Sequence, residues 1–96
     1  MQYILFIHNN AGSRATEEEW DEFFSRARAS GLFAGGSEIN NRQVLGSQPV
    51  PAITDSIAGF MRFETDNKNA LLQLLELHPV LVHGGTLELC EMPKSQ

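Results

Sequence analysis

The chain has 96 residues, of which 42% are hydrophobic and 20% charged, and its formal net charge is -5. This length predicts a single domain over residues 1–96. An acidic chain with scattered lysines and arginines lacks the field that attracts a phosphate backbone, which argues against nucleic-acid binding. The single cysteine, Cys90, excludes an internal disulfide, and we expect a cytoplasmic protein. No segment approaches the ~20 apolar residues of a membrane span, and the apolar run at residues 3–7 is too short for a signal peptide.

Residues 3–8 are rich in β-branched and aromatic types and predict a strand. Both of its faces are apolar, one with Tyr3, Leu5 and Ile7 and the other with Ile4 and Phe6. A strand with two apolar faces is buried on both sides. In so short a chain, helices can cover only one of them.

A helix follows, and Thr16 and Glu19 predict a capping box at its start. An apolar stripe with helical spacing predicts its buried face: Trp20, Phe23, Phe24 and Ala27. Gly31 predicts its end. Residues 32–39 predict a second strand, in which Gly35 and Gly36 indicate a bulge or a close approach by another group.

Residues 40–56 contain Gly46, Pro49 and Pro51 and show no sustained period, so they predict a loop. A loop of this length in a compact domain is more often functional than idle. We expect it to form one wall of a small-molecule pocket.

The remaining elements are a strand over residues 57–64, a helix with Asp66 as its N-cap, and a strand over residues 86–92. Leu71, Leu74 and Leu75 form the apolar stripe of this helix. His78 falls in its last turn, where a positive imidazole suits the helix dipole. Residues 93–96 are expected to be a frayed tail.

The order βαββαβ predicts an α+β, ferredoxin-like fold: a four-stranded antiparallel sheet with two helices on one face. The helix-free face then exposes apolar side chains such as Phe6. We therefore expect a homodimer in which two such faces pack together.

Several segments resemble the YCII-related family, including its DGPF-type branch. They are the opening QYILFIH, the glycine pair after the first helix, Thr54-Asp55 before Gly59-Phe60, and above all HPVLVHGGTLELCEMP at residues 78–93. The resemblance covers residues 2–93 and implies a subunit that dimerises into an α+β barrel, in a family most of whose members have no assigned reaction.

By position, the resemblance matches Asp55 to the Asp of the family's Asp-Gly, and it matches Gly84, Gly85, Thr86 and Glu88 to its Gly-Gly-Thr-x-Glu strand. The Gly-Pro-Phe that follows this Asp in the DGPF branch is absent. The first-helix histidine of some members is also absent.

The catalytic candidates are His8 at the end of the first strand, His83 before the last strand and Asp55 in the long loop. An imidazole serves as acid or base near neutral pH, and a carboxylate beside it fixes its tautomer and raises its basicity. We therefore expect Asp55 to lie within reach of His8 or His83. The alternatives are solvated strand-end histidines and an aspartate that only forms a turn.

Arg62 and Glu88 are the ligand-binding candidates, because each is charged and has apolar neighbours in its strand. A charge in such a place is paired or hydrated. One interpretation is a structural ion pair across the sheet. The other is the polar floor of a pocket between two sheets, where Arg62 holds an anionic or enol oxygen. Zinc spacings such as HExxH are absent, and we expect no metal and no cofactor.

Two main functional hypotheses follow. The first is a cofactor-free enzyme that uses His/Asp acid–base chemistry on a small aromatic or carbonyl compound. The second is a non-catalytic ligand-binding or accessory dimer with the same pocket. A purely structural role for the dimer is a third.

Overall fold

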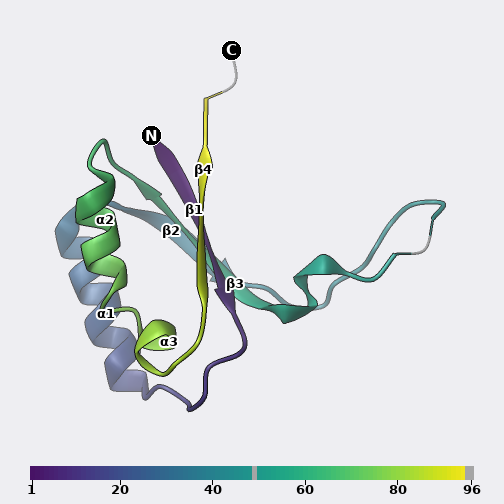
Figure 1. Ribbon diagram of the computed structural model, residues 1–96, viewed down its shortest axis with the longest axis horizontal. Helices are drawn as coiled ribbons and strands as arrows, with labels where there is room; N and C mark the ends of the chain where they lie inside the picture. Colours follow the sequence, from purple (N-terminus) through teal and green to yellow (C-terminus); the bar gives the residue numbers. More distant parts are fainter. Residues whose placement is uncertain (49, 95–96) are drawn as a thin grey trace.

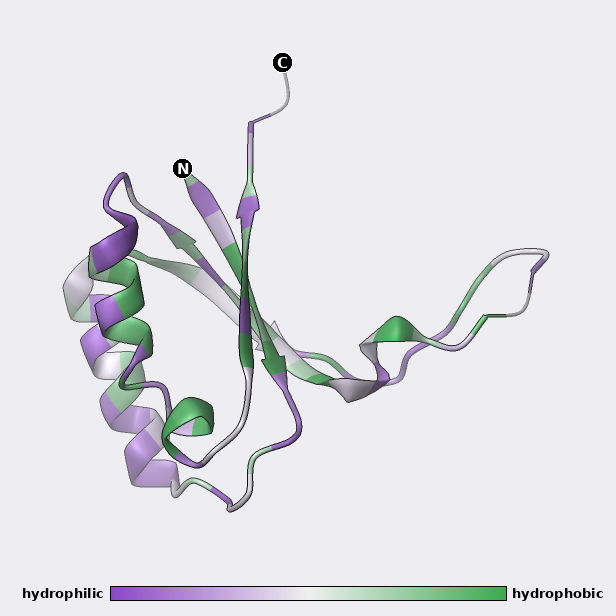
Figure 2. Ribbon diagram, in the orientation of Figure 1, coloured by the Kyte–Doolittle hydropathy of each residue, from purple (hydrophilic) through white to green (hydrophobic). Residues whose placement is uncertain are grey.

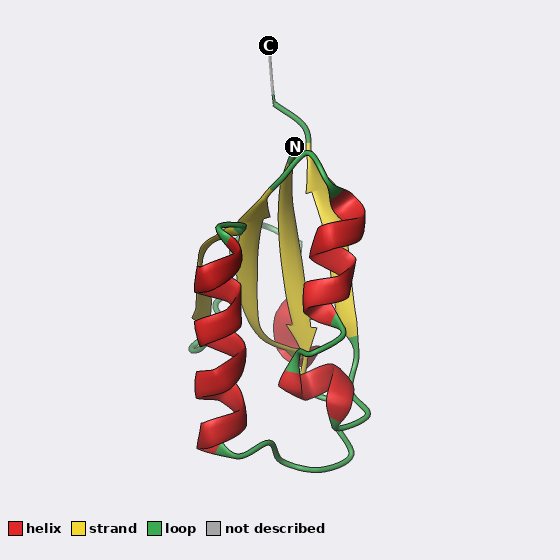
Figure 3. Ribbon diagram, turned by 90° about the vertical axis from the view of Figure 1, so that its left-hand side faces the viewer, coloured by secondary structure: helices red, strands yellow, loops and turns green. Residues whose placement is uncertain are grey.

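A computed structural model describes residues 1–48 and 50–94, which form one four-stranded sheet with helices on one side (Figure 1). The strands are β1 (Gln2–His8), β2 (Phe33–Glu38), β3 (Ile57–Glu64) and β4 (Leu87–Met92), in the order β2-β3-β1-β4. All neighbouring strands are antiparallel. The helices α1 (Glu17–Ser30), α2 (Lys68–Leu75) and α3 (Pro79–Val82) lie in front of the sheet in Figure 3. The predicted α+β fold is confirmed.

The limits of α1 follow from local chemistry. The Thr16 hydroxyl accepts a hydrogen bond from the Glu19 backbone N–H, and the Glu19 carboxylate accepts one from the Thr16 N–H, both at 3.1 Å. Gly31 ends the helix with a φ of 74°, a conformation that glycine adopts without steric cost. Both predicted signals are confirmed.

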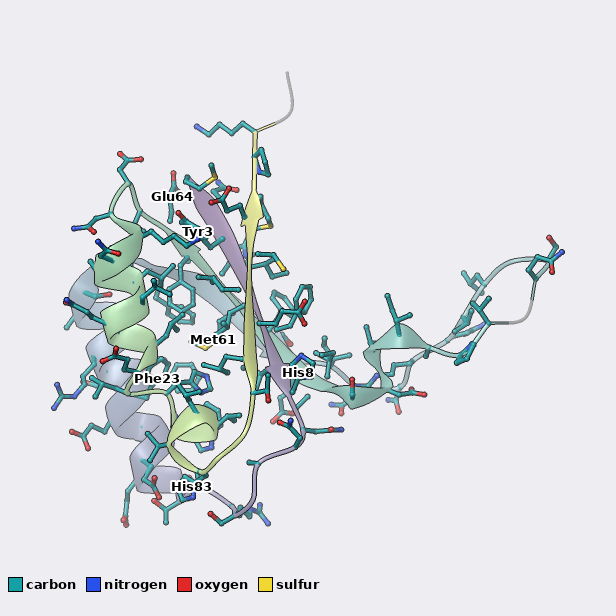
Figure 4. The ribbon with its side chains drawn as sticks, viewed as in Figure 1. Tyr3, His8, Phe23, Met61, Glu64 and His83 are labelled. Atoms are coloured by element: carbon teal, nitrogen blue, oxygen red, sulfur yellow. The ribbon has the colours of Figure 1, made fainter. Side chains whose placement is uncertain are left out.

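The core lies between the helices and the sheet. Tyr3, Leu5 and Ile7 of β1 point into it, and each is at most 9% exposed. They pack with side chains from α1, α2 and β3: Phe23, Ala27, Leu71, Leu74, Leu75, Met61 and Phe63. Figure 4 shows Tyr3, Phe23 and Met61 in this layer. The predicted alternation of β1 is confirmed.

The opposite face of the sheet carries no helix. Its central pairs are Phe6 with Phe60 and Ile4 with Cys90, and all four side chains are half-buried. We call this surface the open face. It also includes Met92 and the charged residues Arg62 and Glu88.

Two details of the second helical region differ from the prediction. Asn67, not Asp66, is the N-cap of α2 and accepts from the Ala70 N–H, while Asp66 contacts the N-terminal amine at 3.3 Å. The short helix α3 was not predicted, because His78-Pro79 was interpreted only as an end. A proline is well placed in the first turn of a helix, and His78 supplies the N-cap.

The loop predicted for residues 40–56 projects from the sheet, and we call it the arm. Its last turn is the 3-10 helix η1 (Ile53–Ser56). Figure 1 shows that it projects from the sheet on the side away from the helices. Pro49 lies outside the described residues, as do residues 95–96 of the predicted tail, while Pro93 and Lys94 have no regular structure.

None of the helices in the described part of the chain is long and apolar enough to cross a membrane.

Candidate functional site

A cleft of about 700 Å³ lies at the end of the sheet where the arm begins. One wall comes from the helices, through Trp20 and Phe24 of α1 and Val80 of α3. The Trp20 and Phe24 rings stack with centroids 5.9 Å apart, and Phe33 of β2 lies 6.0 Å beyond Phe24. Trp20 and Phe24 belong to the stripe that was predicted to be buried, but both are only half-buried, and together with Phe33 they form an aromatic wall of the cleft.

Two glycines make the floor of the cleft. Gly36 of β2 and Gly59 of β3 lie on the helix-covered face and line the cleft. A Cβ on Gly36 would strike the Phe60 carbonyl, and one on Gly59 would lie 2.8 Å from the Ser37 carbonyl. The strands therefore approach closely here, and both positions line the cleft without a side chain.

We expect Gly59→Ala to destabilise the protein by about 1–3 kcal/mol, because the added methyl forces the backbone of two strands apart. Gly12→Ala is the matched control, since its Cβ would meet the His83 carbonyl at an ordinary 3.5 Å. Urea denaturation measures both. Equal midpoints for the two variants would contradict the close approach.

The polar end of the cleft is built at the base of the arm. Arg42, Asp55 and Asn9 all line it. Arg42 donates from Nε to the Thr54 carbonyl at 2.8 Å and from Nη2 to the Ile57 carbonyl. Asn9 donates to the Asp55 carbonyl at 3.2 Å, which ties the end of β1 to η1. The expected wall from residues 40–56 is thus limited to the base of the arm.

The expected contact between Asp55 and a histidine is absent among the described residues. His8 contacts Glu88, with 3.1 Å between Nε2 and Oε1, and His83 contacts Ser13 and Glu19. Figure 4 shows why: His8 lies at the end of β1 on the side away from the helices, and His83 lies near the start of α1. The three residues predicted to form one site occupy three places.

Arg62 and Glu88 do not form the predicted ion pair. Arg62 donates from Nη2 to the Ala34 carbonyl at 3.0 Å. β1 separates the two strands that carry them, and the register places Arg62 opposite Ile4 but Glu88 opposite Phe6. Both side chains are exposed on the open face, and neither lines the cleft.

His83 is the centre of a second polar cluster. Its Nδ1 is 2.7 Å from the Ser13 hydroxyl, and its Nε2 is 2.7 Å from Glu19 Oε2. The hydrogen bond from His83 lowers the pKa of Glu19, and the Thr16 N–H lowers it further. A hydroxyl, an imidazole and a carboxylate hydrogen-bonded in series, as Ser13, His83 and Glu19 are, also occur as nucleophile, base and orienting group in hydrolases. Neither Ser13 nor His83 lines the cleft, however, and the cluster joins three segments, so we interpret it as a structural clamp.

His78 is the only buried polar residue within the described range, with no exposed surface. Its Nδ1 accepts from the Val80 N–H, and its ring packs 4.7 Å from Phe23 and 5.1 Å from Trp20. Burial lowers its pKa to about 4. The prediction of a positive His78 at a helix end is therefore wrong, because the ring is a neutral N-cap inside the aromatic core.

No group of three or more His, Cys, Asp or Glu side chains suited to a metal ion occurs in the part of the chain that the structure describes. The charged residues that line the cleft are Asp55, Glu38 and Arg42, beside the aromatic wall.

Comparison with known proteins gives one informative result. The structure is similar to that of 5-chloro-2-hydroxyhydroquinone dehydrochlorinase (TftG) from Burkholderia phenoliruptrix AC1100, solved in complex with 2,5-dihydroxybenzoquinone. The TM-score is 0.61, and the match covers 99% of this chain and 96% of the other at 12% sequence identity. At this identity the similarity establishes the fold alone. No family model matches the sequence, and no curated protein matches it.

Proposed function

We propose that this protein binds a small aromatic or carbonyl-bearing molecule in the cleft. The observation that carries this proposal is a cleft of about 700 Å³ that joins an aromatic wall to a polar end. Ligand sites are typically concave, ~300–1,000 Å³ in volume and mostly apolar, with a few polar groups that orient the ligand. The bound dihydroxybenzoquinone of the structural neighbour has this chemistry, a flat ring with acidic oxygens.

Trp20 provides a direct test, because it is the only tryptophan of the chain and lines the cleft. We expect 2,5-dihydroxybenzoquinone to quench its fluorescence saturably. Asp55→Asn should tighten binding of this acidic probe severalfold, since it removes a like charge at the polar end. Asp66→Asn is the matched control at the opposite end of β3. Unsaturable quenching, identical in a free tryptophan solution, would contradict binding.

A second candidate is a cofactor-free enzyme, favoured by Asp55, which lines the cleft. A carboxylate there can accept a proton from a phenol or from a carbon beside a carbonyl group. His8 and His83 remain predicted catalytic residues, but their contacts lie elsewhere, so we assign the base to Asp55. Asp55→Asn would then abolish consumption of a chlorinated hydroquinone while binding persists.

We further propose that two copies pair through the open face. Phe6, Phe60, Ile4 and Cys90 leave an apolar surface that a monomer exposes to water. Arg62 and Glu88 lie on the same face, so a twofold axis can bring Arg62 of one copy to Glu88 of the partner subunit. In such a dimer both face the space between the sheets, as their predicted ligand-binding role requires.

The quoted sequence segments support membership in the YCII-related family, and the single cysteine supports a cytoplasmic location. Both are proposals.

A further inference from the structure

The arm is more apolar and more exposed than a surface loop needs to be. Ile53 is 93% exposed and Leu45 81%, and Val44 and Val50 are exposed as well. Figure 2 shows these hydrophobic stretches along the projection. Large apolar side chains gathered on one segment mark a surface that another molecule covers.

The base of the arm has a fixed direction. The Arg42 guanidinium, at the start of the arm, donates to the Thr54 and Ile57 carbonyls at its end. Asn9, which follows β1, donates to the Asp55 carbonyl of η1. In Figure 1 the arm leaves the sheet on the side of the open face, and in Figure 3 it lies behind the sheet, away from the helices.

The reach of the arm matches a stacked sheet. Face-to-face sheets lie ~10 Å apart. The outgoing segment, residues 40–45, precedes the bend at Gly46, and six residues can span up to about 20 Å, which exceeds that gap. A second copy on the open face would therefore stand directly in the path of the arm.

We infer that the arm of each copy clasps the other copy, with Leu45 and Ile53 as its contact residues. This inference rests on the proposed dimer through the open face. Because a twofold dimer is self-complementary, two arms embrace the pair symmetrically. The arm then adds to the contact that the sheets make, which explains why it is longer than the β2–β3 connection requires.

The test is the double variant Leu45→Ser/Ile53→Ser in the full chain, measured by sedimentation equilibrium. We expect its dimer dissociation constant to rise at least about tenfold, because both side chains lose apolar contacts. The control is Leu77→Ser/Val82→Ser, which removes two exposed apolar side chains from the helical side; its dissociation constant should stay within about threefold of wild type. Circular dichroism and the Trp20 probe signal confirm that each variant is folded.

The outcomes separate the two ideas. If the wild type is a dimer and Leu45→Ser/Ile53→Ser has the same dissociation constant, the clasp is overturned but the dimer through the open face is not. A wild-type chain that stays monomeric at micromolar concentration overturns both. If Leu45→Ser/Ile53→Ser dimerises like wild type but no longer retains a protein that the wild type captures from a lysate, the clasp is also overturned. The arm would then contact that protein and not the second copy.

Discussion

Lowering the pH from 7 to 4 is expected to reduce the free energy of unfolding by about 3 kcal/mol through His78 alone. Burial lowers the pKa of His78 from 6.5 to about 4. Between these values the unfolded chain binds a proton that the native chain does not, so stability falls as the pH falls through this window. Urea denaturation at a series of pH values measures the effect.

His78→Asn isolates this contribution from that of the carboxylates. Asparagine is a good N-cap and retains an oxygen that can accept from the Val80 N–H, but it does not titrate. The variant starts from a lower stability at pH 7 because a smaller side chain leaves a cavity. Its stability should nevertheless decline less between pH 6.5 and 4. Parallel pH profiles for wild type and variant would show that His78 is not buried as a neutral ring.

The elements of this fold were largely predictable, because their signals are local. The Thr16–Glu19 capping box and Gly31 depend only on residues a few positions apart, and the strand β1 is defined by its own alternation. The error at Asp66 has the same origin: two adjacent residues can both cap a helix, and in the structure Asn67 does so while Asp66 is exposed.

The site was less predictable, because it depends on which face each side chain meets after folding. The helical spacing of Trp20 and Phe24 is identical for a core stripe and for a cleft wall. Gly36 carried a signal, since an interior glycine indicates close approach, and it does line the cleft. Arg42 carried none, as its partners are backbone carbonyls twelve and fifteen residues away.

His8 and His83 both stand where the sheet meets loops, yet they belong to different faces of the molecule. Glu19 was interpreted only as a capping residue, although one carboxylate can serve a helix end with one oxygen and His83 with the other. Sequence spacing does not encode such a long-range second contact.

We expect Phe6→Asp to raise the dimer dissociation constant at least about 100-fold, because it removes an aromatic contact at the centre of the interface and places a second carboxylate beside Glu88. Phe6 is paired with Phe60 and Glu88 on neighbouring strands and does not line the cleft, so binding of the probe by each subunit should survive. Light scattering and sedimentation equilibrium measure the change.

Leu72→Asp is the matched control, since it makes the same chemical change at a side chain of α2 that is 43% exposed on the helical side. Interfaces that hold permanent dimers bury roughly 2,000 Å² or more, and their central aromatic residues carry much of the binding energy. Cys90 reports on the same surface independently, because it lies two strands from Phe60 and beside Ile4. Its thiol should react slowly in the wild-type dimer and quickly in the Phe6→Asp variant. If Phe6→Asp and Leu72→Asp leave the same oligomer and the same Cys90 reactivity, the open face is not the interface, and the clasp by the arm loses its foundation as well.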